Sequence, residues 1–68
     1  MRLLDDPKLL GEKVEEEAEE VVRAGREETD ERVAEEAADL LYHLSVLLVS
    51  RGVSQAAVME VLNARSGQ

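Results

Sequence analysis

The sequence predicts an all-α fold, an antiparallel helical hairpin followed by a short third helix. No stretch alternates apolar and polar residues with enrichment in β-branched side chains, so we expect no strands. The four glycines and the single proline, Pro7, divide the chain of 68 residues into segments of helical length. No internal repeat or linker interrupts these segments, and residues 1–68 are therefore expected to form one domain.

Asp6 is expected to cap the first helix, with Pro7 in the opening position, where the missing N–H costs nothing. We expect this helix to run to about Ala24, because Gly25 can adopt the left-handed conformation that ends many helices.

Thr29 or Asp30 is expected to cap a second long helix that runs to about Ser50. Gly52 then supplies the left-handed residue that ends it. The second half of this helix is apolar nearly all round, which is typical of a helix that is buried on both sides. Two other short helices cannot easily surround it, so we expect a second subunit to do so.

Ser54 is expected to cap a third helix that runs to about Ala64. Its expected core residues are Val58, Met59, Val61 and Leu62. A domain of this size buries only about 60% of its unfolded surface, and without disulfides it needs very regular packing, a metal or a partner chain. Size alone therefore also predicts a dimer or higher homo-oligomer.

Composition excludes several classes of protein. The net charge is −8, from 16 acidic and 8 basic residues, and there is no cysteine. A disulfide-stapled miniprotein and a thiolate metal site are therefore impossible, and no basic patch is visible that could bind a nucleic acid. The longest purely apolar stretch is residues 46–49, far short of the roughly 20 residues that cross a membrane. We expect a cytoplasmic protein that contacts neither membrane nor nucleic acid.

One acid interrupts the apolar stripe that the first helix is expected to bury. Leu10, Val14, Val21 and Ala24 form this stripe, and Glu17 falls in its middle. An isolated buried carboxylate costs several kcal/mol, and sequence rules tend to break at functional sites. The interruption therefore marks a candidate site.

Each long helix also offers two carboxylates three residues apart, Glu17 with Glu20 and Glu36 with Asp39. Residues at this spacing share a helix face. Two such pairs that face each other across a hairpin would form an oxygen-rich site of the kind that suits Mg²⁺ or Mn²⁺. The alternative is that both pairs are ordinary solvated surface, as the other glutamates are expected to be.

Two motifs carry a family resemblance. Residues 16–20 read EExxE and, after 15 intervening residues, residues 36–39 read ExxD. This pair resembles the all-α, MazG-like nucleoside triphosphate pyrophosphohydrolase superfamily. Residues 35–44, EEAADLLYHL, and the Arg51-Gly52 pair resemble more specifically the phosphoribosyl-ATP pyrophosphohydrolase family.

The resemblance implies roles for particular side chains. The implied Mg²⁺ ligands are Glu17, Glu20, Glu36 and Asp39, with Mn²⁺ as a possible substitute. Glu16, Glu17 and Glu20 are the implied catalytic acids, with Glu16 as the candidate that orients or deprotonates water. Lys13 would contact substrate phosphate. For His43 two interpretations stay open: it touches the substrate or hydrogen-bonds a ligand carboxylate, or it is a partly buried histidine satisfied by Asp39 one turn back.

The implied reaction is hydrolysis of phosphoribosyl-ATP to phosphoribosyl-AMP and pyrophosphate, the second step of histidine biosynthesis. The resemblance also implies paired subunits in a four-helix, MazG-like assembly, and an additional N-terminal helix that precedes the segment matched by residues 2–4. Two alternatives stay open, a housecleaning pyrophosphohydrolase of other nucleoside triphosphates and a non-catalytic helical dimerisation module.

Overall fold

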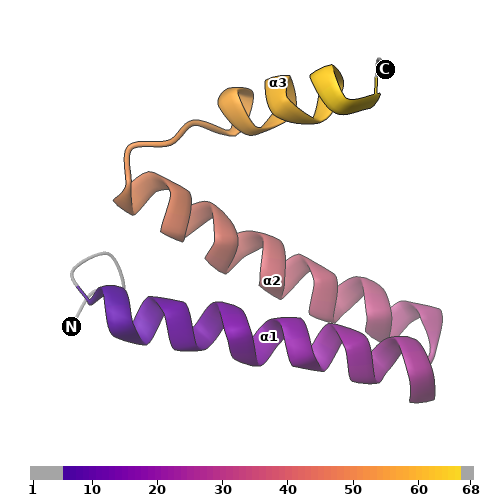
Figure 1. Cartoon of the computed structure of the whole chain (residues 1–68). Helices are drawn as coiled ribbons and strands as arrows, with labels where there is room; N and C mark the ends of the chain where they lie inside the picture. The colour runs from indigo at the N-terminus through magenta and orange to yellow at the C-terminus, as the bar shows by residue number, and fades with distance from the viewer. Residues whose placement is uncertain (1–5, 67–68) are drawn as a thin grey trace.

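The computed structural model describes residues 6–66, and it consists of three helices joined by short connections. Helices α1 (Pro7–Glu27) and α2 (Asp30–Ser50) lie side by side and antiparallel, whereas α3 (Gln55–Ser66) turns back across the far end of α2 (Figure 1). Residues 6–66 contain no strand. The predicted all-α class is therefore confirmed, as are the hairpin and the short third helix.

Helix α1 begins as predicted and ends later than predicted. The Asp6 carboxylate accepts a hydrogen bond from the backbone N–H of Leu9 at 3.0 Å, and Pro7 opens the helix. The predicted stop at Gly25 is wrong, because α1 continues to Glu27. Glu28 ends the helix in an extended conformation, so the connection needs no left-handed residue at Gly25.

Helix α2 has the predicted ends. Thr29 is its cap, and the Thr29 hydroxyl accepts a hydrogen bond from the backbone N–H of Arg32 at 3.2 Å. The helix ends at Ser50, and Gly52 follows at a φ of 70°, the only positive φ among the described residues. Only two residues, 28 and 29, therefore separate α1 from α2.

Helix α3 begins at its predicted cap but lacks the predicted core. The Ser54 hydroxyl accepts a hydrogen bond from the backbone N–H of Ala57 at 3.0 Å, and the helix runs to Ser66, two residues beyond the predicted end. Its apolar side chains were expected to be core, but all are exposed: Val58, Met59, Val61 and Leu62. They lie within an arc of about 160° at 100° per residue, and Val58, Met59 and Leu62 line the groove beside α2 without being buried there.

The described chain encloses little of its own apolar surface. Leu10 and Ala24 are its only fully buried apolar residues. The accessible surface is 5419 Å², whereas a compact monomer of 7.5 kDa exposes about 4,200 Å². The radius of gyration is 13.8 Å, against about 11 Å for a compact domain of this length. The excess of roughly 1,200 Å² is what a helical hairpin leaves open when its apolar faces lack partners.

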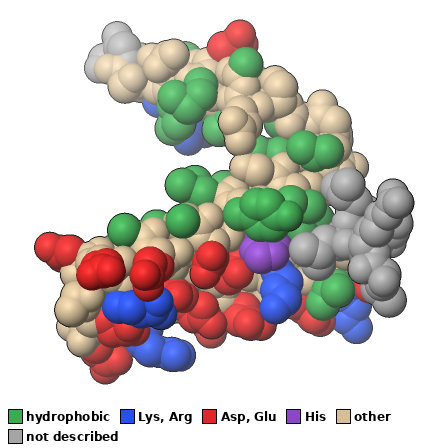
Figure 2. Space-filling model, turned by 180° about the vertical axis from the view of Figure 1, so that it is seen from behind, with side chains coloured by type: hydrophobic (Ala, Val, Ile, Leu, Met, Phe, Trp, Pro, Cys, Tyr) green, Lys and Arg blue, Asp and Glu red, His purple; other side chains and the backbone are tan. Residues whose placement is uncertain are grey.

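Charged and apolar side chains gather on different parts of the molecule. Acidic and basic side chains crowd the hairpin, while apolar side chains border a hollow between α2 and α3 (Figure 2). This groove has a volume of about 470 Å³, and its lining includes Leu41, Leu44, Leu48, Met59 and Leu62. Among the described helices, none is long and apolar enough by itself to cross a membrane; α2 and α3 meet that test only as a pair bent by 108°.

Candidate functional site

The candidate site lies between α1 and α2, where both helices turn carboxylates inward. Glu17 and Glu20 come from α1, and Glu36 comes from α2. Glu36 is the most enclosed charged residue of the described chain, at 8% exposure. Burial of a carboxylate without a partner costs several kcal/mol, so the contacts of each acid decide whether the arrangement is tolerated.

Glu20 and Glu36 approach each other across the helix pair. Each lies eight residues from Glu28, on opposite sides of the connection. A hydrogen bond to Glu36, with burial and the negative charge of nearby acids adding to it, raises the pKa of Glu20 above its ordinary value of 4.5. The same hydrogen bond lowers the pKa of Glu36, and Arg32 lowers it further. The pKa values of the two carboxyl groups are therefore moved apart, that of Glu20 upward and that of Glu36 downward.

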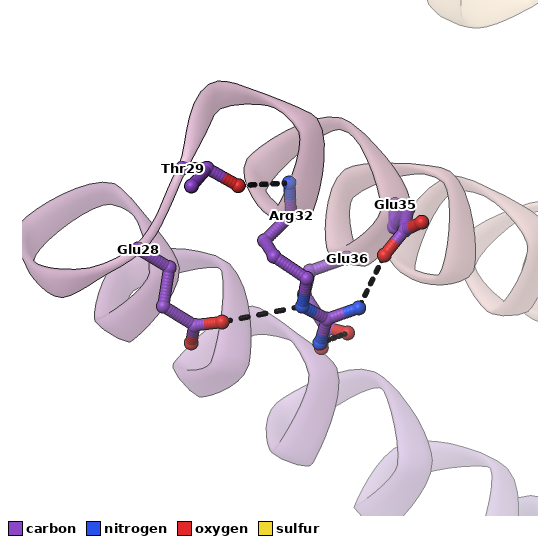
Figure 3. Close-up of polar contacts among 5 residues, drawn as sticks. All are labelled: Glu28, Thr29, Arg32, Glu35 and Glu36. Carbon is purple, nitrogen blue, oxygen red and sulfur yellow. Dashed lines mark hydrogen bonds and ion pairs between the residues drawn. The ribbon is translucent and has the colours of Figure 1, made fainter.

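Arg32 is the cation that holds Glu36 in its charged form. Its Nη2 atom lies 2.8 Å from Glu36 Oε1, its Nε atom lies 3.2 Å from Glu28 Oε1, and its Nη1 atom pairs with Glu35 (Figure 3). These hydrogen bonds raise the pKa of the guanidinium, those to Glu35 and Glu28 most of all. Arg32 was not among the predicted site residues, although its position four residues before Glu36 is the spacing of a helical ion pair.

Glu17 finds its neighbour on α2 in His43. The Nδ1 atom of His43 lies 2.6 Å from Glu17 Oε1, and both side chains are largely buried, at 16% and 12% exposure. The same Nδ1 atom lies 3.2 Å from the backbone carbonyl oxygen of Asp39, in hydrogen-bonding geometry. Glu17 Oε1 is itself enclosed and accepts no well-oriented hydrogen bond from any described residue. A buried carboxylate oxygen is therefore left with a close but poorly aligned neighbour.

The remaining predicted site residues lie further out. Asp39 is exposed. Lys13 Nζ lies 4.0 Å from Glu16 Oε1, and both side chains are about half exposed. The structure thus brings together Glu20 with Glu36 and Glu17 with His43, and it leaves the other three at the periphery.

The described side chains meet part of what Mg²⁺ requires. In residues 6–66 no three acidic or histidine side chains lie close enough to hold a metal ion as they stand. The donors are nevertheless hard carboxylate oxygens, two of them converge from different helices, and Glu17 Oε1 is an enclosed oxygen without an aligned donor. These features fit a cation with oxygen ligands. The ligand set itself stays a prediction.

Comparison with known proteins agrees with the motifs. Residues 1–66 match the family described as phosphoribosyl-ATP pyrophosphohydrolase. A phosphoribosyl-ATP pyrophosphatase of Caulobacter vibrioides is 47% identical over 66 residues, which are 97% of this chain and 62% of that protein. The phosphoribosyl-ATP pyrophosphatase of Streptococcus sanguinis is 54% identical over 56 residues, or 82% of this chain and 54% of that protein.

Longer proteins contain the same stretch. The histidine biosynthesis bifunctional protein hisIE, chloroplastic, of Arabidopsis thaliana is 48% identical over an alignment of 69 positions, which covers 98% of this chain and 24% of that protein. No solved structure matches significantly. The chain spans less than two thirds of the length of the curated phosphoribosyl-ATP pyrophosphatases that it matches. Its sequence and its all-α fold place it in the phosphoribosyl-ATP pyrophosphohydrolase family.

Proposed function

We propose that this chain contributes to hydrolysis of phosphoribosyl-ATP to phosphoribosyl-AMP and pyrophosphate in histidine biosynthesis, with Mg²⁺ as cofactor and Mn²⁺ as a possible substitute. The proposed setting is the cytoplasm, and the proposed active form is a homodimer or higher homo-oligomer. The observation that carries the proposal is the approach of Glu20 and Glu36 from opposite helices, within the two motifs on which the family resemblance rests.

The proposed cation ligands are Glu17, Glu20, Glu36 and Asp39. When bound, Mg²⁺ would neutralise charge on the phosphates and lower the pKa of a water molecule. A nucleotide with three linked phosphates carries several negative charges, and an acidic surface would repel it without a cation. The net charge of −8 therefore supports a cation-dependent reaction over one in which side chains alone bind the phosphates.

Three further side chains have proposed roles around these ligands. His43 orients Glu17, because its ring lies against the Glu17 carboxylate and leaves it little freedom to turn. Glu16 is the candidate to accept a proton from the attacking water, since it is adjacent in sequence to Glu17 and its carboxylate is exposed. Lys13 can leave the long contact with Glu16 to meet a substrate phosphate, because a contact of 4.0 Å between exposed groups is weak.

The test is pyrophosphate release from phosphoribosyl-ATP, with Mg²⁺ and with EDTA, by the wild type and by Glu36→Gln. The variant keeps the shape of the side chain and can still accept a hydrogen bond from Arg32. Glu19→Gln is the matched control, because Glu19 is exposed on α1 and has no proposed role. We expect Glu36→Gln to lose activity by roughly 100-fold or more, at least as much as removal of residues that support a metal site.

Other results would contradict the proposal. Wild-type turnover that is unchanged in EDTA would exclude the cation dependence, and equal turnover by Glu36→Gln and Glu19→Gln would exclude the site. Faster hydrolysis of other nucleoside triphosphates than of phosphoribosyl-ATP would assign the chain to a housecleaning activity. No hydrolysis of any nucleotide would favour a helical dimerisation module.

A further inference from the structure

Arg32 contacts three carboxylates through three different nitrogen atoms, and only one of these carboxylates is buried. The Glu28 and Glu35 side chains are 36% and 53% exposed and Arg32 is 47% exposed, whereas the Glu36 side chain is only 10% exposed. The two outer contacts therefore resemble ordinary surface ion pairs. The third contact places a positive charge 2.8 Å from the carboxylate that lies deepest between the helices.

We propose that Arg32 is a positioning residue that occupies Glu36 while no divalent cation is bound and gives Glu36 up when one binds. This inference rests on the proposed function only in taking Glu36 as a cation ligand. In the cation-free protein, the guanidinium supplies the opposite charge that a buried carboxylate needs. A bound cation would supply that charge instead.

The geometry allows Arg32 to release Glu36 without leaving its place. The contacts to Glu28 and Glu35 use Nε and Nη1, so both can persist when Nη2 loses its partner. Because the side chain is 47% exposed, water can replace the lost hydrogen bond at Nη2. Release of Glu36 therefore leaves no buried donor unsatisfied.

The same geometry makes Arg32 a competitor of the cation. Nη2 lies against Glu36 Oε1 and so occupies one of the oxygens that a cation would need. A divalent cation about 5 Å from the guanidinium would also be repelled by its charge, which in a well-solvated setting weakens binding by roughly tenfold. Removal of Arg32 should therefore tighten cation binding.

The experiment is a Mn²⁺ titration of the full chain, in which the electron paramagnetic resonance signal of free Mn²⁺ reports the bound fraction. The variant is Arg32→Met, which keeps the length of the side chain and favours helix. The matched control is Arg26→Met. This substitution removes the same charge from the same end of the hairpin, and Arg26 makes no ion pair within the described part of the chain. Circular dichroism verifies that both variants stay helical.

We expect Arg32→Met to bind Mn²⁺ about 3- to 20-fold more tightly than the wild type, and Arg26→Met to stay within about twofold because exposed charges are screened. Binding by Arg32→Met alone, with none by the wild type, would support the proposal in its strongest form. Weaker binding by Arg32→Met, the same change in both variants, or no binding by any of the three proteins would overturn it.

A second measurement follows the release itself. Nuclear magnetic resonance of the Arg32 guanidinium in the wild type should show faster hydrogen exchange of its Nη2 group when Mg²⁺ is added, while its Nε hydrogen stays protected by Glu28. Unchanged Nη2 exchange at saturating Mg²⁺ would contradict the proposal. Pyrophosphate release is assayed separately: tighter Mn²⁺ binding without hydrolysis would exclude the proposed function alone, and hydrolysis without tighter binding would exclude the role of Arg32 alone.

Discussion

Leu41 lies on the apolar face of α2, beside the groove between α2 and α3, and its replacement tests whether two copies of the chain associate through this face. Leu41 is 62% exposed although it stands in the most apolar part of the sequence. Full burial of a leucine side chain is worth about 1.5–3 kcal/mol, so burial of the exposed part would contribute about 1–2 kcal/mol. In a two-fold dimer each contact occurs twice, which gives about 2–4 kcal/mol.

We therefore expect Leu41→Gln to raise the dissociation constant of the dimer by roughly 30- to 700-fold, because each 1.4 kcal/mol is tenfold. Glutamine has nearly the size and helix propensity of leucine, so the hairpin itself should stay folded. Sedimentation equilibrium over a dilution series measures the constant. Val22→Gln is the matched control, since Val22 is 54% exposed on α1 and does not line the groove.

Two results would refute this reasoning. A wild type that sediments as a 7.5 kDa monomer at every concentration would mean that the open apolar surface is not an interface between copies. Equal weakening by Leu41→Gln and Val22→Gln would mean that association does not use this face of α2.

Four further predictions concern stability and cation binding. The pKa of Glu20 is raised in the folded state, so the stability that Glu20 contributes is fully present below its unfolded pKa near 4.5 and is lost as pH rises through the raised pKa. The pKa of Glu36 is lowered, so the stability that Glu36 contributes is lost only as pH falls below 4.5. In thermal melts, the melting temperature should therefore gain a contribution from Glu20 as pH falls from neutral to 4.5. This contribution should be absent in Glu20→Gln and retained in Glu19→Gln. Leu10→Ala should lower the free energy of unfolding by about 2–3 kcal/mol in urea titrations, because Leu10 is fully buried, whereas Leu9→Ala should cost less. Asp6→Ala should cost about 1 kcal/mol by the same measurement through loss of the helix cap, with Asp6→Asn as the near-neutral control. Millimolar Mg²⁺ should raise the melting temperature relative to EDTA in the wild type and not in Glu36→Gln; equal shifts would contradict the proposed ligand.

Helix ends were predictable wherever one side chain satisfies the free backbone groups. Asp6, Thr29 and Ser54 each accept a hydrogen bond from a backbone N–H three residues later, as capping residues do. The expectation at Gly25 failed because a glycine permits a left-handed stop but does not require one. The actual stop depends on Glu28 being extended directly before the Thr29 cap.

That error matters for the site. In an antiparallel hairpin, the centre of the connection decides which residues face each other. An end at Ala24 instead of Glu27 shifts this centre by more than one residue, and so changes which carboxylates meet. The sequence could therefore predict that the Glu17–Glu20 pair and the Glu36–Asp39 pair each share a helix face, but not that Glu20 in particular meets Glu36.

The position of α3 was not predictable for another reason. A helix is positioned by the surface that covers its apolar stripe, and the large apolar residues of α3 do form one, since they lie within an arc of about 160° at 100° per residue. Val58, Met59 and Leu62 of this stripe line the groove beside α2, yet all three stay exposed. The sequence could therefore indicate the apolar side of α3, but not which surface covers it.

The inward-facing acids are not all compensated alike. Glu20 and Glu36 have the hydrogen bond between them, and Glu36 also has Arg32. Glu17 has the ring of His43 beside it, but its enclosed Oε1 accepts no well-oriented hydrogen bond from a described residue. A set of acids that served only solubility would lie in water, where none of these arrangements is needed. The partly exposed guanidinium of Arg32 can instead give Glu36 up to another cation without removing a buried contact of the apolar core. The arrangement of these acids therefore favours a site that exchanges its positive charge over a permanently neutralised helix interface.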